Sequence, residues 1–209
     1  MNIKKTGVGL LSIVFSLGMI SFSSYANDNT RFGYLGFSHK INNSSDINFA
    51  VDQTFLNDST TDLSVSKSGT SNRIFAGYHF NQYIALEVGY DDGTHGDFSY
   101  KQNGVTTLTG NVNSSAWDVR IVLTKPITGN LFAKATLGRH FWDLNQAQLH
   151  LDNGVLAKSN VMLDGEDKVI GLGLGFALNR NNAFVFDIEQ RNMADEKIQS
   201  FAFSYISKF

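Results

Sequence analysis

The chain of 209 residues contains no cysteine and only one proline. Without cysteine it can form neither a disulfide bond nor a lipoprotein anchor. After residue 26, no apolar run approaches the roughly 18 residues that a membrane-spanning helix needs. The scarcity of proline, together with 19 glycines and 12% aromatic residues, favours strands over helices, because aromatic side chains suit strands and proline interrupts their hydrogen bonds.

The first 26 residues have the composition of a secretory signal peptide. Lys4 and Lys5 precede an apolar segment at residues 7–19, and Ser24 and Ala26 place small side chains third and first before a cleavage point. We therefore expect a signal peptide at residues 1–26 and a single domain at residues 27–209. The alternative, a retained membrane anchor, is disfavoured because the apolar segment is short.

Basic residues are scarce in the rest of the chain. Removing Lys4 and Lys5 from the 17 basic residues leaves 15 against 19 acidic residues, which gives a net charge of −4. A nucleic-acid-binding protein usually carries a basic stripe, so this balance argues against a nucleic-acid partner.

Apolar residues alternate with polar or small residues in a series of short segments. Most of these segments approach the roughly 9–11 residues with which a tilted strand crosses a bilayer. We expect eight strands, at residues 31–40, 72–80, 83–91, 116–127, 131–142, 168–178, 183–191 and 198–209.

The connections between these segments alternate in length. Long polar loops are expected at residues 41–71, 92–115 and 143–167, short turns at 81–82, 128–130 and 179–182, and a connection of middling length at 192–197. Transmembrane barrels have short periplasmic turns and long extracellular loops. The sequence therefore predicts an all-β fold: an eight-stranded antiparallel up-and-down transmembrane β-barrel with both termini on the periplasmic side.

The two faces of the expected strands differ in polarity. A Lys or Arg on the lipid face at mid-depth costs about 2–4 kcal/mol, so the charged face must line the lumen. Eight strands leave an interior about wide enough for side chains to fill, and we expect ion pairs there. The members of this lumenal ion-pair network are expected to be Glu87, Asp118, Arg120, Lys134, Asp187 and Glu189. A narrow ion path or gate is the alternative role for the same residues.

Aromatic residues gather near the ends of the expected strands, where they fit two interfacial girdles. The girdle residues are expected to be Phe80, Tyr83, Phe132, Phe184 and Phe209 near the periplasmic rim, and Tyr90, Trp117, Phe141 and Trp142 near the outer rim. Two long loops contain Asn-Gly between strand-like flanks, at residues 103–104 and 153–154, and this pair is a strong hairpin signal. We therefore expect the strands of the second and third long loops to run on beyond the membrane as exposed hairpins.

Several stretches resemble OmpA-type outer-membrane barrels. Residues 83–91 (YIALEVGYD) are similar to the third strand of that family, residues 125–138 (KPITGNLFAKATLG) to its turn between the fourth and fifth strands, and the preceding residues 76–81 (AGYHFN) also fit. Such barrels commonly end on a strand with a terminal Phe, as this chain does. The resemblance assigns a C-terminal assembly signal to Phe201, Phe203, Tyr205 and Phe209.

The resemblance implies a monomeric barrel in the outer membrane of a Gram-negative bacterium. Its partners would be outer-membrane lipid and lipopolysaccharide, the barrel-assembly machinery and periplasmic chaperones. It also implies that Glu87 joins an internal ion-pair network. The family's inward basic residue in the middle of the last strand is missing, and Lys208 stands nearest. The family's peptidoglycan-binding domain is absent as well, so we do not expect anchoring to the cell wall.

No residue pattern points to catalysis, a metal or another cofactor. The five histidines, His39, His79, His95, His140 and His150, match no nucleophile–base pattern of barrel enzymes. The acidic residues at 91–97 depart from the calcium-loop spacing and are interpreted as a solvated turn. The glycines at 171, 173 and 175 lie within a strand that no helix follows, so they do not form a phosphate loop.

We therefore predict a non-enzymatic outer-membrane protein that stabilises the envelope and interacts, in the manner of an adhesin, with a host or environmental surface ligand. A low-conductance pore gated by lumenal ion pairs and a lipid-A-modifying enzyme are the alternatives. Arg139 has the lipid-facing phase near the outer rim, where lipopolysaccharide phosphates are candidate partners and snorkelling is the alternative.

Overall fold

Three tight turns reverse the chain at one end of the molecule, called the turn end below. Asn81 Oδ1 accepts hydrogen bonds from the backbone N–H groups of Tyr83 (2.8 Å) and Ile84 (2.9 Å). Asn179 Oδ1 accepts the equivalent bonds from Asn181 and Asn182, both at 2.9 Å. Such Asn side chains mimic a backbone turn. The third turn contains Gly129, whose φ of 43° suits a residue without a Cβ.

The computed structural model describes residues 31–44, 61–66, 68–102, 105–152, 155–193 and 196–209, so the expected signal peptide lies outside the described residues. None of the described segments is a helix long and apolar enough to cross a membrane. The strands of the described chain are β1 (Phe32–Ser44), β2 (Thr61–Ser66), β3 (Ser68–His79), β4 (Ile84–Gln102), β5 (Val105–Thr128), β6 (Leu131–Asp152), β7 (Val155–Ala177), β8 (Asn182–Met193) and β9 (Glu196–Lys208).

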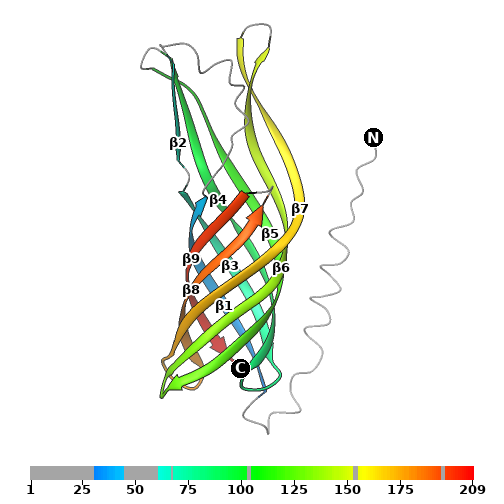
Figure 1. Cartoon of the computed structure of the whole chain (residues 1–209), viewed down its shortest axis with the longest axis vertical. Helices are drawn as coiled ribbons and strands as arrows, with labels where there is room; N and C mark the ends of the chain where they lie inside the picture. Colours follow the sequence, from blue (N-terminus) through cyan, green and yellow to red (C-terminus); the bar gives the residue numbers. More distant parts are fainter. Residues whose placement is uncertain (1–30, 45–60, 67, 103–104, 153–154, 194–195) are drawn as a thin grey trace, which may run out of the picture.

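Eight of these strands close into a barrel (Figure 1). The hydrogen-bonded order is β4-β3-β1-β9-β8-β7-β6-β5, and pairing between β4 and β5 completes the circle. Every neighbouring pair is antiparallel, which confirms the predicted eight-stranded antiparallel barrel. The additional strand β2 pairs with the far half of β4, where Thr61 lies opposite Gln102 and Ser66 opposite Asp97.

Four strands run on well beyond the ranges that the alternation of polarity predicts for the membrane. β4, β5, β6 and β7 contain 19, 24, 22 and 23 residues. The expected loops at 92–115 and 143–167 are instead continuations of these strands, paired as far as Gln102 with Val105 and Asp152 with Val155. The projecting hairpins are thus confirmed in their backbone, and their Asn-Gly tips lie outside the described residues. The end opposite the turns is called the hairpin end below.

Two further connections were predicted too long. Part of the expected polar loop at 41–71 is strand, because β1 continues to Ser44, β3 begins at Ser68, and β2 lies between them. The expected connection at 192–197 is also largely strand, since β8 and β9 pair as far as Met193 with Glu196. Polar residues end the contrast between the two faces, but they do not end backbone pairing, which is why the pattern underestimated these strands.

The two faces of the wall have opposite polarity, as predicted. On β7, Leu172 is 70% exposed on the outer surface, whereas Arg120 on β5 is 1% exposed inside. Inward-facing glycines make room for large side chains of neighbouring strands: a Cβ at Gly77 would collide with the ring of Tyr34, and one at Gly36 with that of Phe75. These two rings pack with Ala85 and Val122 into a buried apolar layer near the turn end.

Candidate functional site

The interior of the barrel contains a network of ion pairs. Its ten charged side chains are each at most 5% exposed and come from the inward faces of β1, β3, β4, β5, β6 and β8. Five are cations and five are anions, so the network is neutral as a whole. Its members are Lys40, Arg73, Arg120, Lys134 and Arg191, with Glu87, Asp91, Asp118, Asp187 and Glu189.

Two arginines hold Asp118 at the centre of the network. Arg73 donates from Nε to Asp118 Oδ2 (2.8 Å) and from Nη2 to Oδ1 (2.6 Å). Arg120 donates from Nε to Oδ1 (2.9 Å) and from Nη2 to Oδ2 (3.0 Å). Bidentate pairs of this kind fix geometry as well as charge. Arg73 also lies 2.7 Å from Glu87 Oε1, and the Tyr34 hydroxyl donates to Glu87 Oε2 (3.1 Å).

A second group of charges extends the network toward the hairpin end. Arg120 donates from Nη1 to Glu189, which also accepts from Lys40 Nζ (2.9 Å). Lys40 in turn binds Asp91 (2.7 Å), as does Arg191 (2.9 Å). A continuous chain of contacts therefore crosses the lumen from Glu87 to Arg191. Lys134 and Asp187 form a further pair at 3.0 Å.

Apolar layers bound the network on both sides. Tyr34, Phe75 and Val122 are buried toward the turn end, while Trp142, Leu144 and other apolar side chains are buried toward the hairpin end. Desolvation of an ion inside a protein costs several kcal/mol unless partners offset it, so each charge here depends on its neighbours. The arrangement fills this level of the lumen with mutually paired side chains.

The structure places all six residues of the expected network in the interior, and each forms at least one ion pair. Sequence reasoning missed Lys40, Arg73, Asp91 and Arg191, although all four lie on the inward faces of their strands. Strand phase could have identified them. Lys208, the expected substitute for the family's basic residue, does not join these pairs, and its Nζ lies 4.4 Å from the centre of the Phe32 ring.

The interpretation of residues 91–97 as a solvated turn was wrong. β4 continues through this segment to Gln102, with a register shift between Thr94 and Gly96, and Asp91 is buried between Lys40 and Arg191. Asp92, its neighbour on the opposite face, is exposed. The density of acidic and glycine residues suggested a turn, but pairing keeps the backbone extended: residues 91–93 pair with both β3 and β5, and the pairing with β5 continues beyond them.

The structure contradicts the expected girdle at two positions. Trp142 is buried inside, where its Nε1 donates to Asp167 (3.3 Å), and Phe132 covers the inward-facing Gly175. Both share the phase of Lys134 and therefore cannot face lipid. The other expected girdle residues, Phe80, Tyr83, Tyr90, Trp117, Phe141 and Phe184, are exposed or half-buried. Tyr90 and Trp117 lie side by side, with ring centres 4.9 Å apart.

The last strand carries its aromatic residues on the outer surface. Phe201, Phe203, Tyr205 and Phe209 are exposed, whereas Ala202 and Ser204 between them are buried. The backbone N–H of Phe209 donates to the carbonyl of Gly33 at 3.0 Å, which joins the end of the chain to the start of β1. The role of these residues as an assembly signal stays a prediction.

The hydrogen bonds recorded for histidines of the described chain go to amide oxygens. His39 Nδ1 bonds to the Asn72 side chain (2.9 Å), and His79 Nδ1 bonds to the Asn81 carbonyl (3.1 Å). His140 is buried without a hydrogen-bond partner on either ring nitrogen. The side chains of His95 and His150 lie outside the described residues. Among the side chains that the structure describes, no cluster of His, Asp and Glu is arranged to hold a metal ion.

Comparison with known proteins identifies the architecture. A family model described as "OmpA-like transmembrane domain" matches residues 33–199. The barrel is similar to the crystal structure of Neisserial surface protein A (NspA), with a TM-score of 0.56 and 12% identity over 86% of this chain and 97% of that one. Ail, the attachment invasion locus protein of Yersinia pestis, gives a TM-score of 0.51 and 10% identity over the same shares.

Ail has also been crystallised in complex with the heparin analogue sucrose octasulfate, and that structure matches equally well, with a TM-score of 0.51 and 10% identity over 86% of this chain and 97% of that one. At these identities the likeness concerns the fold. No curated protein matches the chain.

Proposed function

This chain belongs to the OmpA-like transmembrane domain family and lies in the bacterial outer membrane, and we propose that it acts there without catalysis, as an envelope barrel whose projecting strands bind proteins outside the cell. One observation carries the proposal: the lumen is filled, while four strands run far beyond the length that a membrane requires. The turn end is then periplasmic and the hairpin end extracellular.

The excess strand length supports an external role. A tilted strand crosses a bilayer in about 9–11 residues, whereas β4 to β7 contain between 19 and 24. About half of each strand therefore projects beyond the hydrocarbon. In Figure 1 the projecting parts form two arms, one made by β2, β4 and β5 and the other by β6 and β7. Barrel closure requires neither arm.

The arms present strand edges to the surroundings. β7 pairs with β8 from Val169 onward, so in the described chain its first part, from residue 155 to 168, pairs with β6 alone. The pairing of β5 with β6 ends at Val112–Gln146. Beyond that pair, toward the hairpin end, the two arms are not paired with each other in the described chain. Unpaired backbone groups along an edge are a template for an added strand, which is a common mode of peptide recognition.

Charge favours a protein partner over a sulfated polysaccharide. The described parts of the projecting segments, residues 61–66, 93–102, 105–111, 147–152 and 155–164, hold four acidic residues and two lysines. Sulfate groups would be repelled by this balance, although the Ail barrel has been crystallised with a heparin analogue. Backbone pairing of a protein partner along a strand edge does not require a positively charged surface.

Shortening each arm while keeping its register tests the proposal. In one variant Asn-Gly replaces residues 98–110, so that Asp97 and Asn111, which pair in the structure, flank the new turn. In the other, Asn-Gly replaces residues 148–159 between the paired Ala147 and Asn160. Adhesion of cells expressing each variant would be measured on serum proteins, matrix proteins and heparin.

We expect both variants to assemble, as judged by heat-modifiable gel migration, and at least one to lose adhesion to protein-coated surfaces. Adhesion to protein that is unchanged in both variants would contradict the proposal, and so would binding confined to heparin.

A low-conductance pore is a second candidate function. Buried polar atoms without a protein partner include both ring nitrogens of His140, Thr136 Oγ1 and Ser38 Oγ. Such atoms are commonly satisfied by internal water, which favours a hydrated lumen. Planar-bilayer recording would compare the wild type with Glu87→Gln, which removes a charge facing Arg73. Discrete openings that change with this substitution would support a pore, and silence in both proteins would remove it.

A lipid-A-modifying enzyme was the remaining alternative, and the histidine contacts described above offer no base beside a nucleophile. Mass spectrometry of lipid A from cells with and without the protein tests this point. Identical spectra are expected, and a modification that depends on the protein would contradict the non-enzymatic proposal.

A further inference from the structure

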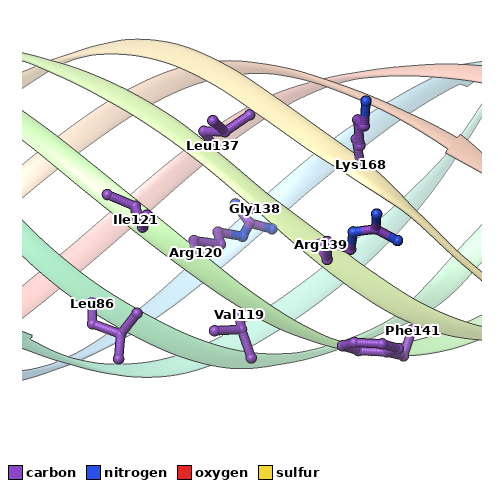
Figure 2. A pocket seen from close by; sticks show the side chains of 9 residues that line it. All are labelled: Leu86, Val119, Arg120, Ile121, Leu137, Gly138, Arg139, Phe141 and Lys168. Atoms are coloured by element: carbon purple, nitrogen blue, oxygen red, sulfur yellow. The ribbon is translucent and has the colours of Figure 1, made fainter.

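A groove of about 500 Å³ runs along the outer surface of β4, β5, β6 and β7 (Figure 2). Its apolar lining consists of Leu86, Val119, Ile121, Leu137 and Phe141, all on the lipid-facing side of the wall. Val119 is the smallest of these side chains and lies between larger ones, which accounts for the hollow. The remaining exposed lining residues are two cations, Arg139 and Lys168.

The cations occupy one end of the groove. Figure 2 shows Leu86, Ile121 and Leu137 at one side, and Arg139 and Lys168 with Phe141 at the other. Arg139 and Lys168 are directly opposite each other in the register of β6 and β7. Arg139 binds Glu166 (2.7 Å), and both side chains are about half exposed. No ion pair of Lys168 is recorded among the described residues, so Arg139, Lys168 and Glu166 together carry one net positive charge. The exposed acids Asp143 and Asp164 lie opposite each other four residues further toward the hairpin end.

The cations lie near the outer boundary of the hydrocarbon. Arg139 is eight residues beyond Leu131, where β6 begins at the turn end. Eight steps of about 3.3 Å along a strand tilted by about 40° rise about 20 Å, within an apolar band about 25 Å tall. Phe141 and its register partner Trp117 follow immediately toward the hairpin end. Aromatic belts of this kind mark the headgroup level.

We propose that this groove binds one molecule of lipopolysaccharide in the outer leaflet, with an acyl chain of its lipid A along the apolar lining and a lipid A phosphate between Arg139 and Lys168. Arginine and lysine are the residues that suit phosphate, arginine by its planar fork and lysine as a point charge. Glu166 holds Arg139 against the wall and leaves a net positive charge for the anion. The proposal is independent of the external binding role and of the filled lumen.

The charge pattern distinguishes this site from simple snorkelling. A snorkelling cation reaches for water and needs neither a partner nor a neighbouring hollow. Here two cations from adjacent strands lie directly opposite each other at the headgroup level, and the groove leads from them toward the membrane interior. An anionic headgroup attached to an acyl chain complements both halves of the site.

Native mass spectrometry of the folded barrel in detergent tests the proposal. The probes are lipid A with its phosphates, the same lipid A after dephosphorylation, and phosphatidylglycerol. The variants are R139Q/K168Q, which removes the cations, Val119→Phe, which fills the hollow, and Lys125→Gln, an exposed lysine of β5 that does not line the groove. Heat-modifiable migration checks that each variant is folded.

We expect the wild type to retain phosphorylated lipid A in preference to both other lipids. R139Q/K168Q should weaken retention about tenfold or more, Val119→Phe should weaken it with the cations intact, and Lys125→Gln should leave it unchanged. Equal retention of dephosphorylated lipid A or of phosphatidylglycerol by the wild type would overturn the proposal. So would equal behaviour of R139Q/K168Q and Lys125→Gln. If the double variant does not fold, the retention of the three lipids by the wild type and of phosphorylated lipid A by Val119→Phe still tests the proposal.

Discussion

Asp118 illustrates how strongly a single side chain in this lumen depends on its partners. Its two carboxylate oxygens accept four hydrogen bonds from Arg73 and Arg120. Without that negative charge the two guanidinium groups would face each other in the buried interior of the barrel. Glu87 and Glu189 would remain as the acids beside them, one for each arginine.

The substitution Asp118→Asn should therefore destabilise the barrel by about 3–5 kcal/mol, the usual cost of removing one partner of a buried ion pair. Urea unfolding in lipid vesicles measures the change in free energy. Asp92→Asn is the matched control, because Asp92 is an exposed acid near the same level of the wall. Equal effects of the two substitutions would show that Asp118 is not structurally paired.

The fluorescence of the two tryptophans of the chain can show which of them lies on the lipid-facing surface and which inside the barrel. Trp117 is 40% exposed on the outer surface, and Trp142 is 6% exposed inside the barrel. In vesicles of brominated lipid, we expect Trp142→Phe, which leaves Trp117, to show strong quenching of fluorescence. Trp117→Phe, which leaves Trp142, should show little quenching. Quenching of similar strength in both variants would place Trp142 at the lipid surface.

At the scale of the residue, strand phase was the most informative feature of the sequence. It placed Glu87, Asp118 and Arg120 inside, where they meet. Phase was applied less strictly to the aromatics, and Phe141 and Trp142 were assigned to one belt although adjacent strand residues point to opposite faces. The pairing of each acid with its base could not be predicted, because partners such as Arg73 and Asp118 lie on strands far apart in the sequence.

At the scale of the element, alternating polarity predicted the membrane-spanning half of each strand, whereas the projecting halves were predicted only from the Asn-Gly pairs at their tips. Within the membrane, lipid and lumen impose opposite polarities on alternate residues, as in Leu172 and Gly173. Outside it the outer face meets water instead of lipid, so the sequence of β5 from residue 105 to 115 shows no such contrast while the backbone still pairs with β4. Asn-Gly at 103–104 was the remaining local signal.

The final strand permits a test of the assembly signal separately from stability. Phe209→Ala keeps the backbone hydrogen bond to Gly33 and removes an exposed ring. We expect purified protein to fold into detergent as well as the wild type, while the folded fraction in the outer membrane of cells falls. Phe186→Ala removes an equally exposed ring from β8 and is the control. If both substitutions lower the cellular fraction alike, Phe209 has no special role in assembly.

At the scale of the whole molecule, the absence of cysteine allows the orientation of the barrel to be measured. Asn130 lies in the turn between β5 and β6, and Asn160 lies on the projecting part of β7, with both residues exposed. Because the wild type has no thiol, Asn130→Cys and Asn160→Cys would each report one site. The proposed topology puts the first in the periplasm and the second outside the cell.

A membrane-impermeant maleimide applied to intact cells should therefore label Asn160→Cys and spare Asn130→Cys. Permeabilising the outer membrane should make the two variants equally reactive, which controls for the intrinsic reactivity of each thiol. Labelling of Asn130→Cys on intact cells would reverse the orientation. In that event the long strands would project into the periplasm, the lipid site at Arg139 and Lys168 would face the inner leaflet, and neither external proposal would stand.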